Sequence, residues 1–230
     1  MNTERFTLYR SCENYFDWLK SLIPFLLLLL ISCSNNVEER LSDEEFELIF
    51  EEGASFYRSE NFEAAYSIWM PLAEQGYAEA QYHLGIMIVS GSIGNEDLDS
   101  GVHWIRRATE ENHTGALYSM GELHSLDLRG RSNYLGNKDY ETALSYFQRA
   151  VGQGSFASML SLGWVYEHGQ GVSQNDVTAY MWYFLAINED DLARNRSEML
   201  AERMTASQID MAIEFAEQCA SSEYQRCQFE

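Results

Sequence analysis

The sequence predicts an all-α fold, a solenoid of about four helical hairpins with a capping helix at each end. Three segments align without a gap, namely residues 65–85, 101–121 and 143–163. Repetition with a period of roughly 20 to 50 residues is the signature of a repeat array. Composition agrees, because 46% of the 230 residues are hydrophobic and only two are proline. Such a chain can bury a sizeable core without interrupting its helices.

Each copy repeats one pattern of small, bulky, loop-forming and glycine positions. Along the three copies these are Ala65, Gly101 and Ala143; Ile68, Trp104 and Tyr146; Gly76, Asn112 and Gly154; and the closing glycines Gly85, Gly121 and Gly163. Glycine has no Cβ, so two helix backbones can approach each other closely where it lies. The closing glycines therefore predict close helix crossings.

Two strings carry a resemblance to a known family. Residues 73–85 read Ala-Glu-Gln-Gly-Tyr-Ala-Glu-Ala-Gln-Tyr-His-Leu-Gly, and residues 162–172 read Leu-Gly-Trp-Val-Tyr-Glu-His-Gly-Gln-Gly-Val. They resemble the Sel1-like repeat, a relative of the tetratricopeptide repeat, over residues 43–228. The resemblance implies a right-handed α/α superhelix of antiparallel helix pairs that holds other proteins together, without a family-wide catalytic activity. Ile88 and His124 depart from it, since the family pattern has tyrosine there.

The expected elements follow in order along the chain. A capping box at residues 42–45 opens an amphipathic helix with Phe46, Ile49, Phe50, Phe56 and Tyr57 facing inward. Helix pairs follow at 62–75 with 78–90, 97–111 with 114–127, 139–152 with 155–168, and 175–188 with 190–203. A second capping box at 205–208 starts a closing helix that ends near Cys219. The expected organisation is a signal peptide (1–32), a polar tether (33–41), a capping helix (42–60), repeats (61–204), and a closing helix with tail (205–230).

The N-terminus has the pattern of a targeting segment. An apolar run at residues 22–31 is too short to span a membrane and has the length of a signal-peptide core. Residues 30–33 resemble a bacterial lipobox, which implies lipid modification of Cys33, and by the same resemblance Ser34 favours the outer membrane. We therefore expect an outer-membrane lipoprotein facing the periplasm. Acidic residues that match the basic ones before the core leave open a start after Met1, an uncleaved anchor or a plain secretory signal.

The other cysteines fit an oxidising compartment. Cys219 and Cys227 are eight residues apart and are separated by a predicted turn, so they are candidates for a disulfide. This spacing also resembles the cysteine pairs of secreted, cysteine-rich members of the repeat family. Two unpaired thiols in the tail are the alternative.

Catalytic and metal-binding patterns are missing from the sequence. The five histidines form neither an H-E-x-x-H pattern nor a zinc-binding pattern with the cysteines, and we interpret His124 as a packed imidazole. No G-x-S-x-G elbow occurs. A net charge of −21 argues against nucleic-acid binding and leaves open a basic partner or simply a solvated surface. We expect no catalytic residue, metal or cofactor.

Positions that vary among the copies indicate a binding surface. We predict that His103, Arg106, Gln148 and Tyr183 contact a protein partner in a concave groove formed by the first helix of each pair. Tyr183 also belongs to a row that is bulky in every copy, for which packing between repeats is the alternative. Arg106 and the adjacent Arg107 fit an acidic ligand or, alternatively, pair with Glu110 and Glu111.

The predicted function is a non-catalytic scaffold or adaptor of the bacterial cell envelope, monomeric and binding a protein partner. The alternative is a cell-wall-related hydrolase or a glycan-binding or peptidoglycan-binding envelope protein.

Overall fold

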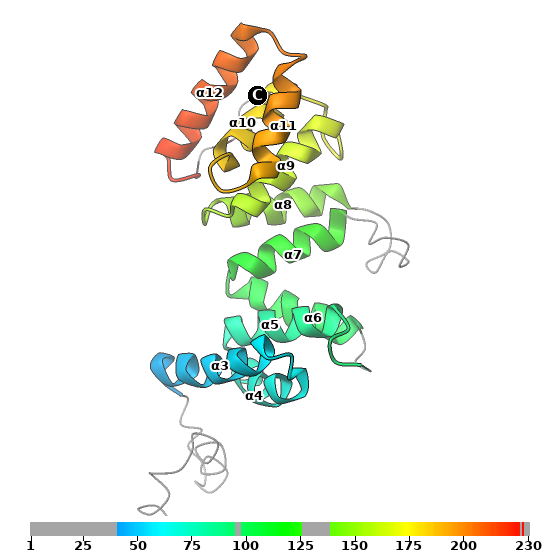
Figure 1. Cartoon of the computed structure of the whole chain (residues 1–230), viewed down its shortest axis with the longest axis vertical. Helices are drawn as coiled ribbons and strands as arrows, with labels where there is room; N and C mark the ends of the chain where they lie inside the picture. Colours follow the sequence, from blue (N-terminus) through cyan, green and yellow to red (C-terminus); the bar gives the residue numbers. More distant parts are fainter. Residues whose placement is uncertain (1–40, 95–97, 126–138, 226, 228–230) are drawn as a thin grey trace, which may run out of the picture. The chain divides into compact units, whose positions relative to one another are not determined.

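The computed structural model describes residues 41–94, 98–125, 139–225 and 227, and the regular structure in these segments is helical (Figure 1). Within them, no helix has the length and apolarity that crossing a membrane requires. Cys33 and the apolar run at 22–31 lie outside the described residues. The chain divides into two compact units, residues 1–68 and residues 69–230, with the boundary inside helix α4 (Phe62–Glu74).

The first unit contains helix α3 (Asp43–Arg58), which begins with the predicted capping box. The Glu45 amide donates to Ser42 Oγ at 3.3 Å, and the Ser42 amide donates to the Glu45 carboxylate at 2.9 Å. These bonds satisfy N–H groups that a helix start leaves without partners. Phe46, Ile49 and Phe50 are buried as predicted, whereas Phe56 and Tyr57 are half-buried.

The second unit contains the predicted series of helices. They are α5 (Ala78–Val89), α6 (Leu98–Glu110), α7 (Thr114–Ser125), α8 (Tyr140–Val151), α9 (Phe156–His168), α10 (Asp176–Ala186), α11 (Asp191–Ala201) and α12 (Ala206–Ser221). The predicted positions of these helices are confirmed. The loop residues Gly76, Asn112 and Gly154 have φ angles of 96°, 56° and 80°. This left-handed conformation suits glycine and is tolerated by asparagine, which explains the residue types at this repeat position.

The tight helix pairs differ from the predicted hairpins. The most extensive packing joins α5 to α6, α7 to α8 and α9 to α10, so each predicted hairpin packs more closely on the next one than within itself. The closing glycines explain the difference. A Cβ on Gly85 would lie 2.6 Å from Ile105 Cγ1, and one on Gly121 or Gly163 would overlap the ring of Phe147 or Tyr183. The predicted close crossings are thus confirmed, but they join neighbouring hairpins.

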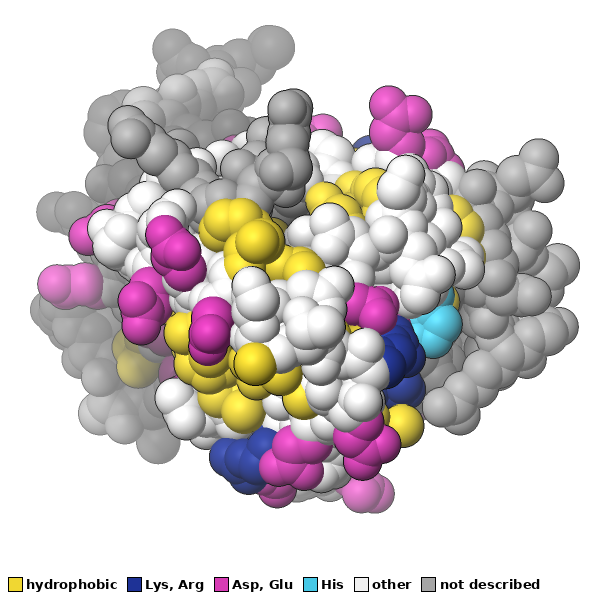
Figure 2. All heavy atoms as spheres, turned by 90° about the horizontal axis from the view of Figure 1, so that it is seen from above, with side chains coloured by type: hydrophobic (Ala, Val, Ile, Leu, Met, Phe, Trp, Pro, Cys, Tyr) yellow, Lys and Arg dark blue, Asp and Glu magenta, His cyan; other side chains and the backbone are white. Residues whose placement is uncertain are grey.

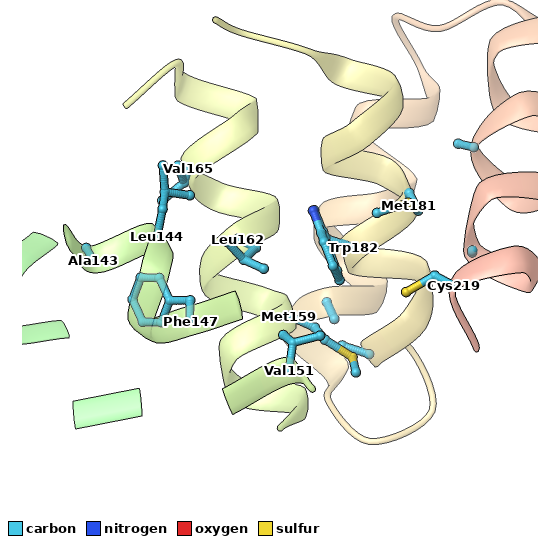
Figure 3. Close-up of a cluster of buried hydrophobic side chains, with 14 residues drawn as sticks. Ala143, Leu144, Phe147, Val151, Met159, Leu162, Val165, Met181, Trp182 and Cys219 are labelled. Atoms are coloured by element: carbon cyan, nitrogen blue, oxygen red, sulfur yellow. The ribbon is translucent and has the colours of Figure 1, made fainter. Parts of the chain in front are cut away.

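The row of bulky residues that includes Tyr183 forms the centre of the packing between neighbouring hairpins. Trp69, Ile105, Phe147 and Tyr183 are each no more than 1% exposed, which confirms the packing alternative for the row. Figure 3 shows Phe147, Leu162 and Trp182 on α8, α9 and α10 within one cluster of buried side chains. Side chains of α12 complete that cluster, so the closing helix covers the last apolar face as expected.

The chain reverses direction after α12. Glu223 and Tyr224 have positive φ angles, and the Tyr224 amide donates to the Cys219 carbonyl at 3.1 Å. In this arrangement Cys219 and Cys227 form a disulfide with their Cα atoms 4.7 Å apart. Gln225 Nε2 donates to the Gly152 carbonyl at 2.9 Å, which ties the tail to the end of α8.

Candidate binding pocket

A pocket of about 260 Å³ lies in the second unit. Its walls come mainly from second helices of the predicted pairs, α7, α9 and α11, and its floor includes one residue each from α8 and α10. The lining residues are Tyr118, Glu122, Ser125, Phe147, Leu160, Ser161, Trp164, Val165, Tyr183, Leu192 and Arg196. We call this the second-helix pocket.

The closing glycines shape the floor of the second-helix pocket. Because Gly121 and Gly163 lack side chains, the rings of Phe147 and Tyr183 come directly against α7 and α9. Both rings are fully buried, while Tyr118 and Trp164 are half-buried and form aromatic walls. The repeat pattern therefore produces a floor and walls in which aromatic faces predominate.

One end of the pocket carries a carboxylate held by neutral donors. Ser161 Oγ donates to Glu122 Oε1 at 3.1 Å, and Tyr118 is hydrogen-bonded to the same carboxylate. Burial raises the pKa of Glu122 above its ordinary value, although both hydrogen bonds act to lower it. Burial, together with the nearby Glu122 charge, also raises the pKa of Tyr118, so this phenol stays neutral at physiological pH.

At the other end, the charges are already paired. The Tyr183 hydroxyl donates to Glu167 Oε2 at 2.8 Å, and Arg196 and Arg203 approach the Glu167 carboxylate at 3.9 and 3.6 Å. Burial and the bond to Glu167 raise the pKa of Tyr183. Arg203 also binds Asp176 through two contacts of 2.8 and 3.0 Å.

Of the predicted site residues, only Tyr183 lines this pocket. His103 and Arg106 are exposed on α6, and Gln148 is exposed on α8. The structure therefore does not gather the four predicted residues in this site, because most of its lining comes from second helices.

The alternative in which Arg106 and Arg107 pair with Glu110 and Glu111 is not seen, because the described part of the chain has no ion pair to either glutamate. Arg107 instead lies over the ring of Trp104, 5.0 Å from its centroid.

The packed reading of His124 agrees with the structure. Its ring stacks on Tyr146 with centroids 5.7 Å apart, and burial lowers its pKa below the ordinary value of 6.5.

A second charged cluster lies at the start of α5 and was not predicted. Glu79 contacts His83 Nε2 at 3.3 Å and His113 Nε2 at 2.8 Å. His113 Nδ1 accepts a 3.1 Å hydrogen bond from the Ala116 amide, so it caps α7, and its ring stacks on Tyr82. Among the described residues, no group of three histidine, cysteine or carboxylate side chains is arranged to hold a metal ion.

A signal for the second-helix pocket was present in the sequence. The position after each closing glycine changes from Ile86 to Glu122 to Trp164 while the glycine itself is retained. Variation beside a fixed position therefore marks residues of the second helices as well as those of the first helices.

Comparison with known proteins agrees with this architecture. The family model of the Sel1 repeat matches residues 78–113, 115–155 and 157–191. These matches group α5 with α6, α7 with α8 and α9 with α10, as the tight packing does. Comparison with curated proteins gives no match.

Two solved structures are similar to the chain. One is c5321, a protective antigen present in uropathogenic Escherichia coli strains with an SLR fold; it is 26% identical with a TM-score of 0.59, and the match covers 73% of this chain and 37% of that protein. The other is a Sel1 repeat protein from Oxalobacter formigenes, 21% identical with a TM-score of 0.60, covering 79% and 76%. The chain thus spans little more than a third of the first protein. Three matches to the Sel1 repeat therefore lie within residues 78–191 of this chain.

Proposed function

We propose that this protein is a non-catalytic scaffold of the bacterial cell envelope that holds a segment of a partner protein in the second-helix pocket. Sel1-repeat proteins are generally protein-interaction scaffolds. The observation that carries the proposal is the aromatic pocket itself. Its volume of about 260 Å³ is below the ~300–1,000 Å³ typical of small-molecule sites, which suits one or two side chains of a longer segment.

Exposed apolar side chains beside the pocket support binding of a protein. Leu192 lines the pocket and is 51% exposed, and Met199, seven residues later on α11, is 62% exposed. Figure 2 looks onto the end where α11 and α12 lie and shows hydrophobic side chains gathered among acidic ones. Apolar patches with a charged rim are typical of protein-interaction surfaces.

The test compares two methionine or leucine positions of similar exposure. Leu192→Glu places a charge at the pocket, while Met211→Glu places one on α12, where the side chain is 45% exposed and does not line the pocket. We expect quantitative crosslinking and capture from cell envelopes to recover about tenfold less of a specific partner with Leu192→Glu. Equal recovery with the two folded variants would remove the pocket from the proposal.

The envelope location rests on the N-terminal sequence and has its own test. Cys33→Ser removes the residue proposed to carry lipid. We expect the wild-type protein to incorporate a palmitate analogue and remain with membranes after a salt wash, because multiple acyl chains anchor stably. The variant should be released while keeping its helical circular dichroism. Absence of label in the wild type would contradict the lipoprotein proposal.

A further inference from the structure

We propose that the second-helix pocket recognises a basic side chain, a lysine or arginine presented by a segment of the partner protein, through Glu122 and the aromatic rings around it. The inference rests on the proposed scaffold function and specifies the chemistry of the partner. It follows from the partners of the Glu122 carboxylate, the rings that surround it, and the charge of the whole chain.

The carboxylate of Glu122 is part-buried at the pocket. Its donors are the neutral hydroxyls of Ser161 and Tyr118, and within the described residues no ion pair to Glu122 forms. A carboxylate has about four acceptor sites, so two neutral donors leave it unsaturated. Partial burial disfavours the charged form of this carboxylate, and an opposite charge beside it would offset that penalty. Glu167, in contrast, has two arginines and a tyrosine hydroxyl around it.

The remaining lining suits the rest of a basic side chain. Aromatic faces attract ammonium and guanidinium groups, and the half-buried rings of Tyr118 and Trp164 line the pocket with Glu122. The protein already makes such contacts elsewhere, since Arg149 lies 5.9 Å from the centroid of the Tyr146 ring. The long alkyl stem of a lysine or arginine can pack on Leu160 and Leu192.

The overall charge favours the same class of partner. The chain has 36 acidic and 15 Lys or Arg residues, for a net charge of −21. A field of this sign attracts basic segments and repels acidic ones. Arg196 is the basic residue of the pocket lining, but it already faces Glu167 at 3.9 Å. An acidic ligand therefore has neither a free cation in the described lining nor a favourable field.

The experiment measures binding of capped heptapeptides to the full-length protein by calorimetry at pH 7. One peptide has a central lysine between leucines, a second has arginine in its place, and a third has norleucine, which keeps the stem and removes the charge. The protein variants are Glu122→Gln and Glu198→Gln. Glu198 is exposed on the same α11 that supplies Leu192, lies outside the pocket lining, and undergoes the same change of charge.

We expect the lysine and arginine peptides to bind the wild type about tenfold more tightly than the norleucine peptide, because a buried charge-assisted contact is lost without the cation. Glu122→Gln should abolish that difference, and Glu198→Gln should preserve it. Ser161→Ala is a second, milder variant that keeps the Glu122 carboxylate, so the preference for lysine over norleucine should persist in it.

Several results would overturn the proposal. These are equal binding of the lysine and norleucine peptides, no binding of the lysine peptide at millimolar concentration, or equal effects of Glu122→Gln and Glu198→Gln. Partner capture that depends on Leu192 but not on Glu122 would keep the scaffold function and overturn only the basic occupant.

Discussion

Glu79 on α5 and Glu122 on α7 are both part-buried glutamates of the repeat array, yet their carboxylates have opposite surroundings. Glu79 is in contact with His83 and His113, which lower its pKa below the ordinary value of 4.5. Among the described residues, the donors to Glu122 are the hydroxyls of Ser161 and Tyr118, and burial raises the pKa of Glu122. The same residue type therefore has a lowered pKa in one repeat and a raised pKa in the next.

The difference separates a structural contact from a candidate binding residue. Around Glu79 every charge has an internal partner, and His113 also caps α7, so the cluster joins two helices. Glu122 lines the pocket, and its partial burial disfavours the charged form of its carboxylate. Groups with perturbed pKa values in a pocket are candidates for function, whereas satisfied ion pairs are usually structural.

The largest effect is expected where the pocket floor meets a closing glycine. Gly121→Leu forces a branched side chain into the ring of Phe147, which should lower the free energy of unfolding by about 3 kcal/mol. Gly94→Leu is the control, because a Cβ there meets nothing within 4 Å. Thermal unfolding followed by circular dichroism measures both. Similar melting temperatures would show that α7 and α8 do not cross at Gly121.

The second-largest loss of stability is expected from a substitution in the Glu79 cluster. His113→Ala removes the bond to Glu79, the cap on the Ala116 amide and the stacking on Tyr82, at a cost of about 1–2 kcal/mol in urea unfolding. His103→Ala removes an exposed imidazole and should stay within about 0.5 kcal/mol of wild type. If His113→Ala is equally mild, the cluster is not a structural contact.

Replacing each glutamate by glutamine should shift the melting temperature at pH 7 in opposite directions. The raised pKa of Glu122 means that folding opposes its ionisation, so stability falls as pH rises from the unfolded pKa through the folded one. Glu122→Gln should therefore raise the melting temperature slightly at pH 7 and leave it unchanged near pH 3.

The lowered pKa of Glu79 has the reverse consequence. Its contribution to stability is present above the unfolded pKa and is lost as pH falls towards the folded one. Glu79→Gln should lower the melting temperature at pH 7, and the deficit should shrink as pH falls below about 4. Shifts of the same sign for the two variants at pH 7 would refute the contrast.

The smallest effect is expected on the first-helix surface. Arg106→Glu combined with His103→Ala and Gln148→Ala changes only exposed side chains, so unfolding should shift by no more than about 0.5 kcal/mol. If the second-helix pocket is the docking site, partner capture by this triple variant should stay close to wild type. A large loss of capture would return the binding surface to the first helices.

Rules that act over a few residues explain the features that the sequence predicted correctly. The capping boxes at Ser42 and Thr205 set helix starts through bonds to residues three positions later, and both form in the structure. The left-handed conformation at Asn112 and Gly154 likewise follows from the residue type at a fixed place in the repeat. The sequence did not predict which helices pack most closely, because an array of alternating helices can be divided into pairs at either loop.

The sequence by itself determined the helices, the turns between them and the positions of the closing glycines, since each depends on residues within one repeat. It left open whether the bulky row with Tyr183 is buried or contacts a partner. Tertiary structure decided that Gly121 receives Phe147 from the next hairpin, and that Glu122, Ser161 and Trp164 from separate helices border one pocket. Helices α6 to α10 each pack on the helix before and on the helix after them in the array. Contacts between side chains about 40 residues apart, such as Ser161 with Glu122, decide which face of a helix is packed and which lines the pocket. No local sequence pattern specifies such a contact.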